Sequence, residues 1–97
     1  MYTRSDTMDS YTSLMEQYHS ALEKLRKTRD ALEEEVSHLR HELRRVRDGI
    51  ERMSGTPHVL EQQASQLVSN IDLCERELKE NRKLRKRTIE QINSLEN

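Results

Sequence analysis

The sequence predicts an all-α protein, an antiparallel two-helix coiled-coil hairpin, from three observations. Two long stretches carry apolar residues at alternating spacings of four and three, the pattern of a coiled-coil seam. Only two Gly and one Pro occur in 97 residues, and Gly55 and Pro57 stand together between these stretches. Charged residues make up 36% of the chain and aromatic residues 3%, which is typical of solvated helices and leaves little material for a thick core.

The chain is predicted to start with a flexible lead-in over residues 1–9, followed by one helical hairpin over residues 10–97. The lead-in has no apolar period and carries several Ser, Thr and Asp side chains. Asp9 and Ser10 are residue types that cap helices well, so the first helix is expected to begin near residue 10.

The first helix is predicted over residues 10–54. Its seam positions carry Tyr11, Met15, Tyr18, Leu22, Leu25, Arg29, Leu32, Val36, Leu39, Leu43, Val46, Ile50 and Met53. Only Arg29 interrupts the apolar series. At about 1.5 Å per residue the stretch is roughly 60 Å long, which is typical of a coiled coil rather than of a globular helix.

A turn is predicted at residues 55–57, and a second helix over residues 57–96. Gly55 can adopt the left-handed conformation that ends a helix, Thr56 can cap the next helix, and Pro57 suits its first position. The seam positions of this helix carry Leu60, Ala64, Leu67, Ile71, Cys74, Leu78, Asn81, Arg85, Thr88, Ile92 and Leu95. This seam therefore has a polar gap from Asn81 to Thr88.

When the chain folds back at the turn, facing seam residues have numbers that add up to 110, as for Leu39 and Ile71. Arg29 then falls opposite Asn81, so that one polar layer accounts for the interruptions of both helices. A two-helix seam buries only a narrow stripe, so association of two hairpins as a dimer stays open.

A parallel homodimer, the structural coiled coil of a scaffold or cytoskeletal protein, is the alternative. In the hairpin Glu33 lies near Glu75, a like-charge neighbour, whereas in a parallel dimer Glu35 would reach Arg40. Each exposed pair contributes only about 0.2–1 kcal/mol. The short connection keeps the two helices at an effective concentration of about millimolar, which favours the hairpin.

Residues for catalysis, for a cofactor or for a metal ion are not expected. The sequence has no Gly-rich phosphate loop and no base positioned by a third group, so an enzyme is not predicted. His38 and His41 lack the further ligand that a zinc site needs. Cys74, at a seam position, is expected to be a small buried hydrophobe. One cysteine and no long apolar run predict a reducing, cytoplasmic location.

A basic cluster near the C-terminus is expected to be a solvated helix face. It consists of Arg82, Lys83, Arg85, Lys86 and Arg87. Binding of nucleic acid or of acidic lipid through this cluster is the third hypothesis for function. The formal net charge of −1 disfavours it, because the global field does not attract polyanions, and membrane contact is at most peripheral.

Two segments, residues 42–53 and 69–78, resemble the homology-region-one family, also called the Rho effector motif, a family of antiparallel helical fingers. Gly49 matches a glycine of the family signature, although Ile50 replaces the usual Ala. The connection between the two segments is also shorter than in most of the family. The resemblance implies binding of an activated Rho-family small GTPase (Rho, Rac or Cdc42) by the helix faces near the turn.

The predicted partner-binding residues comprise charged side chains of the first helix, several of which belong to the resembling segment, and one leucine of the second helix. They are Arg40, Arg44, Arg47, Asp48, Glu51, Arg52 and Leu73. The charged members could form charge-assisted hydrogen bonds with a GTPase switch surface. Leu73 lies outside the seam and could be an apolar anchor. The alternative interpretation of these residues is an ordinary solvated helix face.

Overall fold

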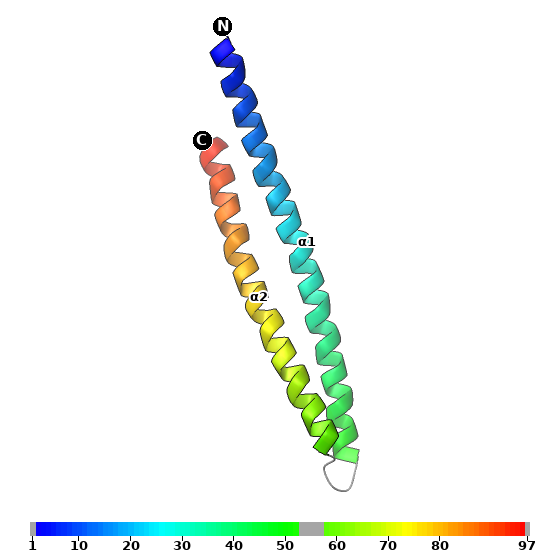
Figure 1. The fold of residues 1–97 in the computed structure, drawn as a ribbon. Helices are drawn as coiled ribbons and strands as arrows, with labels where there is room; N and C mark the ends of the chain where they lie inside the picture. The colour runs from blue at the N-terminus through cyan, green and yellow to red at the C-terminus, as the bar shows by residue number, and fades with distance from the viewer. Residues whose placement is uncertain (1, 53–57, 97) are drawn as a thin grey trace. The chain divides into compact units, whose positions relative to one another are not determined.

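The computed structural model is all-α and consists of two antiparallel helices. It describes the backbone of residues 2–52 and 58–96, and the side chains of residues 10–52 and 58–96. Helix α1 spans Tyr2–Arg52 and helix α2 spans His58–Glu96, and the two run in opposite directions (Figure 1). The predicted two-helix hairpin is thus confirmed. The predicted turn at 55–57, including Pro57, lies outside the described residues.

Helix α1 begins at Tyr2 and not at residue 10, so the boundary predicted at Asp9 and Ser10 is wrong. The sequence from Tyr2 to Ser10 contains no Gly or Pro that would end a helix. Once a helix is nucleated, each added residue gains a backbone hydrogen bond and costs only a few tenths of a kcal/mol in propensity. The polar residues predicted as a lead-in therefore extend the helix.

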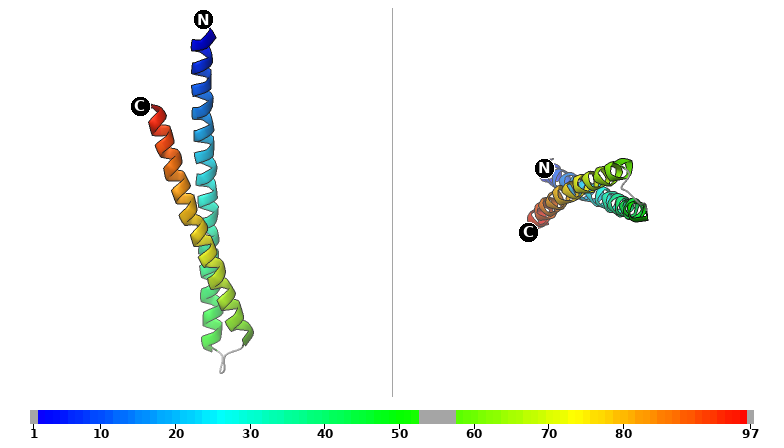
Figure 2. Two further views of the ribbon diagram at one scale, coloured as in Figure 1. Left: turned by 60° about the vertical axis from the view of Figure 1, so that its left-hand side comes forward. Right: turned by 90° about the horizontal axis from the view of Figure 1, so that it is seen from below.

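The chain divides into two compact units, each containing a segment of either helix. We call residues 30–80 the tip unit, and residues 1–29 together with 81–97 the terminal unit. Figure 2 shows the two helices from two further directions.

The core of the tip unit is a continuous aliphatic seam. Its buried side chains are Val36, Leu39, Leu43 and Ile71, and the partly buried Ala64, Leu67, Cys74 and Leu78 pack against them. All eight occupy predicted seam positions, and Leu39 and Ile71 lie in one cluster, as expected from the register. A parallel dimer would need the same seam, which this hairpin already occupies.

The terminal unit has polar residues in its seam. Leu22 and Ile92 are buried there, but so are Asn81 and Thr88, at 5% and 8% exposure. The Asn81 side-chain amide donates to the Leu25 carbonyl oxygen of α1 at 2.9 Å. Asn81 is thus a buried polar residue of the seam, and its partner on α1 is a backbone carbonyl that the heptad pattern did not identify.

Two further hydrogen bonds support the terminal unit. The Thr88 hydroxyl donates to the Leu84 carbonyl of its own helix at 2.9 Å, which satisfies a buried polar group. The Tyr11 hydroxyl donates to the Leu95 carbonyl at 2.9 Å. Tyr11, a predicted seam residue, is 43% exposed because it lies opposite the last turn of α2, where little of that helix remains to cover it.

Candidate partner-binding surfaces of the tip unit

All seven residues predicted to bind a partner lie in the tip unit and are exposed. Three of them share one groove. Arg40, Arg44 and Arg47 follow one another at spacings of four and three, which places them on one face of α1.

These three arginines line an open groove of about 490 Å³, which we call the arginine groove. Leu43 and Ile71, two residues of the seam, also line it. On the α2 side the groove is bordered by Val68 and Asp72. The groove thus has a basic wall on α1, a small apolar patch beneath it, and one carboxylate opposite.

Arg40 forms an ion pair across the helices with Glu75. Both side chains are about half exposed, so the pair contributes at most about 1 kcal/mol. This contact offsets the like-charge pair of Glu33 and Glu75 expected from the sequence. Within the described part of the chain, neither Arg44 nor Arg47 has an ion-pair partner, so these guanidinium groups are available to an acidic surface.

The other four predicted residues lie outside the arginine groove. Asp48, Glu51 and Arg52 are exposed near the end of α1. Leu73 is 54% exposed, but it lies about 100° around α2 from Asp72 and does not line this groove. The structure thus divides the predicted set into an arginine cluster and side chains on other faces.

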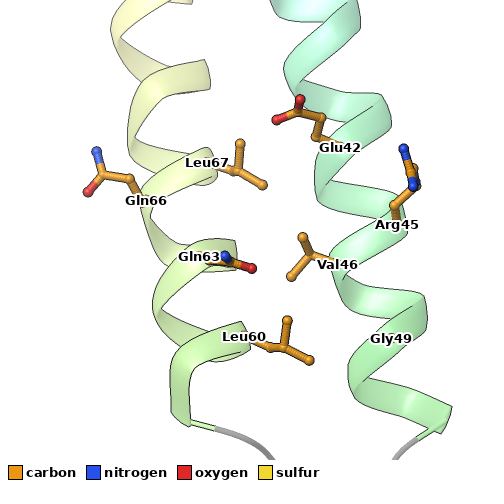
Figure 3. Close-up of a pocket in the computed structure, with 8 residues that line it drawn as sticks. All are labelled: Glu42, Arg45, Val46, Gly49, Leu60, Gln63, Gln66 and Leu67. Atoms are coloured by element: carbon orange, nitrogen blue, oxygen red, sulfur yellow. The ribbon is translucent and has the colours of Figure 1, made fainter.

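A second groove opens beside Gly49, and we call it the glycine groove (Figure 3). It has a volume of about 520 Å³. Val46, Leu60 and Leu67 point into the space between the helices, whereas Gln66 points away from it. Gln63 also lines this groove, which shares no lining residue with the arginine groove.

Gly49 is not required for close packing of the two helices. A Cβ placed there would meet only the Leu60 Cδ1 atom, at 3.9 Å, an ordinary van der Waals distance. A glycine on a helix surface allows close approach, either by the other helix or by a partner. The packing within the hairpin does not account for it, and its effect is to leave the groove open.

The outward surface of α2 beside this groove carries no charge. Residues 62–71 contain no Asp, Glu, Lys, Arg or His, although charged residues make up 36% of the chain. Val59 and Leu73, at 64% and 54% exposure, flank this neutral stretch. Val59, Gln63 and Gln66 line a shallow hollow on this surface. Gln63 and Gln66 also line the glycine groove, so the hollow and the groove adjoin each other. Sequence reasoning identified only Leu73 of this surface.

Cys74 and His38 are two further side chains with groups that can act as a nucleophile or as a metal ligand. Burial raises the pKa of the Cys74 thiol, and the carboxylates of Glu77 and then Glu35 raise it further, so the nucleophilic thiolate is disfavoured. His38 pairs with Glu42 at 3.0 Å on its own helix. No group of three or more His, Cys, Asp or Glu side chains in the described ranges is arranged to hold a metal ion.

The basic cluster at residues 82–87 is divided in the structure. Arg85 is partly buried, and its Nε donates to the Asn81 Oδ1 atom at 2.7 Å, so it belongs to the polar layer. Arg82, Lys86 and Arg87 are exposed. Of the helices described, neither contains a stretch apolar enough to cross a bilayer.

Comparison of the chain with protein-family models, with curated proteins and with solved structures finds no match.

Proposed function

We propose that this chain is a non-catalytic, cytoplasmic protein-binding module that recognises an activated Rho-family small GTPase. The recognition surface in this proposal is the tip unit, with the arginine groove as its centre. Its role would be that of an effector in signalling to the cytoskeleton.

The observation that carries this proposal is the convergence of Arg40, Arg44 and Arg47 on one groove between the helices. The resemblance to the Rho effector motif includes Arg44 and Arg47, within residues 42–53. The second resembling segment, residues 69–78, brings Ile71 and Asp72 to the same groove. Two segments far apart in the sequence thus meet where the proposal requires a binding face.

The chemistry of the groove suits an acidic protein surface. Guanidinium groups form bidentate, charge-assisted hydrogen bonds with carboxylates, and these are stronger than neutral hydrogen bonds. Leu43, Ile71 and Val68 supply apolar contacts beside the charges. A small GTPase rearranges its switch segments when the γ-phosphate is lost, so such a surface can distinguish the two nucleotide states.

The experiment is a binding titration of the full chain against Rho, Rac and Cdc42, each loaded with a non-hydrolysable GTP analogue or with GDP. We expect at least one GTPase to bind in its GTP form and not detectably in its GDP form. The double variant Arg44→Glu, Arg47→Glu should then lose about 2 kcal/mol or more of binding free energy, because two charge-assisted contacts become repulsive.

A matched control reverses Arg82 and Lys86 to Glu, which changes the net charge by the same amount in the terminal unit. This control should bind as the parent does, and circular dichroism should show both variants to be folded. Binding of no GTPase in either nucleotide state would refute the proposal. An equal loss of GTPase-binding free energy in both double variants would mean that only the net charge of the chain affects binding, and the arginine groove would then not be the binding site.

A further inference from the structure

The side of the tip unit that contains the glycine groove carries a second heptad series on each helix. On α1 the series consists of Glu35, His38, Glu42, Arg45, Gly49 and Arg52, and on α2 of Val59, Gln63, Gln66, Asn70 and Leu73. We call these residues the second seam. All are exposed or partly exposed, and spacings of three and four place them along one stripe of each helix.

We infer that the second seam binds a second copy of this chain, with the two tip units antiparallel and related by a two-fold axis. In this arrangement α1 faces α1 of the other copy, and α2 faces α2. An isologous interface of this kind must be self-complementary, because each residue i that meets j is accompanied by j meeting i. The charges on α1 provide a test of that requirement.

Among the antiparallel registers, one pairs all six residues of the α1 series and forms the most arginine–glutamate pairs. When facing residues have numbers that add up to 87, Arg45 meets Glu42 of the second copy and Arg52 meets its Glu35. Symmetry repeats both pairs. In the same register Gly49 faces His38, so an imidazole ring falls opposite the position that has no side chain.

This register also determines which residues meet on α2. Residues facing each other within the hairpin add up to 110, so a sum of 87 for α1 fixes the sum for α2 at about 133. Val59 then falls opposite Leu73 of the second copy, and Gln63 opposite its Asn70. Gln66 meets Gln66 of the second copy near the two-fold axis. The register that the charges of α1 favour thus also pairs apolar with apolar side chains and amide with amide side chains on α2.

The composition and area of this face also fit a protein interface. Interface cores are depleted in charge, as residues 62–71 are, and the exposed Val59 and Leu73 are the apolar side chains that such an interface would cover. The chain exposes 7824 Å², whereas a compact monomer of its mass exposes roughly 5800 Å². This excess is larger than the about 800 Å² that each partner buries in a standard interface.

The first experiment measures mass against concentration by light scattering and sedimentation. We expect twice 11.6 kDa at high concentration and a shift to 11.6 kDa on dilution. The double variant Arg45→Glu, Arg52→Glu should dimerise about tenfold or more weakly, because four attractive pairs become repulsive. Arg44→Glu, Arg47→Glu is the matched control: it makes the same charge change on the other side of α1 and should dimerise like the parent.

The second experiment tests the orientation by cross-linking in a Cys74→Ala background whose fold is checked by circular dichroism. A mixture of the Val59→Cys chain and the Leu73→Cys chain should form a mixed disulfide, and either chain alone should form little. A parallel in-register dimer would instead cross-link each chain with itself. Self-cross-linking of that kind, or a mass of 11.6 kDa at every concentration, would overturn the inference. Neither result depends on GTPase binding, which uses the arginine groove.

Discussion

In the tip unit the seam is filled by aliphatic side chains, whereas in the terminal unit polar side chains occupy several seam positions. Val36, Leu39 and Ile71 belong to a core that has no polar member. In the terminal unit Asn81 and Thr88 are as deeply buried as the neighbouring Leu22 and Ile92. The same heptad spacing thus carries two kinds of packing.

This difference indicates that the stability of the hairpin and the alignment of its two helices have separate sources. Aliphatic layers bury area, but one layer resembles the next, so they discriminate weakly between a correct pairing and a slipped one. In the observed alignment the Asn81 amide donates to the Leu25 carbonyl, and the seam spacing places Asn81 in the layer of Arg29. A shift by one layer would place this buried polar side chain opposite Leu25 or Leu32, and would place an aliphatic side chain opposite Arg29, so a polar group would face an apolar one in both layers. We therefore expect the tip unit to supply most of the stability and the Asn81 layer to fix the alignment.

The largest effect is expected from Leu39→Asp, which places an unpaired charge in the aliphatic core of the tip unit. The loss should exceed about 3 kcal/mol and should unfold the hairpin, because both the apolar contacts and the solvation of the carboxylate are lost. A circular dichroism melt measures this. Ser37→Asp, an exposed change two residues away, is the control and should stay within about 0.5 kcal/mol of the parent. An unchanged melt for Leu39→Asp would contradict the assigned core.

The next effect is expected at Asn81. Asn81→Ala removes the donor to the Leu25 carbonyl and the acceptor of Arg85, and should lower the free energy of unfolding by about 1–3 kcal/mol in urea titrations. Asn81→Leu should be at least as stable as the alanine variant, but should populate more than one alignment. This heterogeneity would appear as additional amide peaks in a ¹H–¹⁵N spectrum. A single set of peaks for Asn81→Leu would show that the layer does not fix the alignment.

A smaller effect of opposite sign is expected for Gly49→Ala. The added methyl group has room beside Leu60, so the gain in helix propensity should raise the free energy of unfolding by about 0.5–1 kcal/mol. Urea titration of the dilute, monomeric chain measures this. Ala31→Gly, at an exposed position of the same helix and unit, should lower the stability by a similar amount. A destabilised Gly49→Ala would mean that the helices approach more closely here.

The smallest effect is expected for Tyr11→Phe in the terminal unit. It removes only the exposed hydrogen bond to the Leu95 carbonyl and should cost about 0.5 kcal/mol. Hydrogen exchange should show the loss as faster opening of the last turn of α2, with no change at Leu39. Faster exchange in the tip unit as well would mean that the two units open together.

Heptad spacing predicted the seam well because the angular position of a residue on a helix depends on its number alone. Val36, Leu39, Ile71 and Ile92 are buried as their spacing required. The start of α1 at Tyr2 was missed because residue types that cap helices are also tolerated within them when no Gly or Pro follows.

The candidate site could be predicted only in part. Spacing places Arg40, Arg44 and Arg47 on one face, but the ion pair of Arg40 with Glu75 depends on side-chain conformations that no spacing specifies. The heptad position of Leu73 already separates it from the arginines, whereas a likeness between sequences groups residues without regard to the side of the helix on which they lie. The glycine groove involves both helices, so it could be located only once the register was known.

The hydrogen bond from Asn81 has a spectroscopic consequence for α1. The Leu25 carbonyl is inside a helix and already accepts the amide of Arg29, so the side chain of Asn81 uses its second lone pair. A carbonyl group whose oxygen accepts two hydrogen bonds has a weaker C=O bond, so its stretching band moves to lower frequency. A ¹³C=¹⁸O label at Leu25 should therefore absorb below the same label at Leu32, and the difference should vanish in Asn81→Ala. This one vibration would report in real time when the two helices come into alignment.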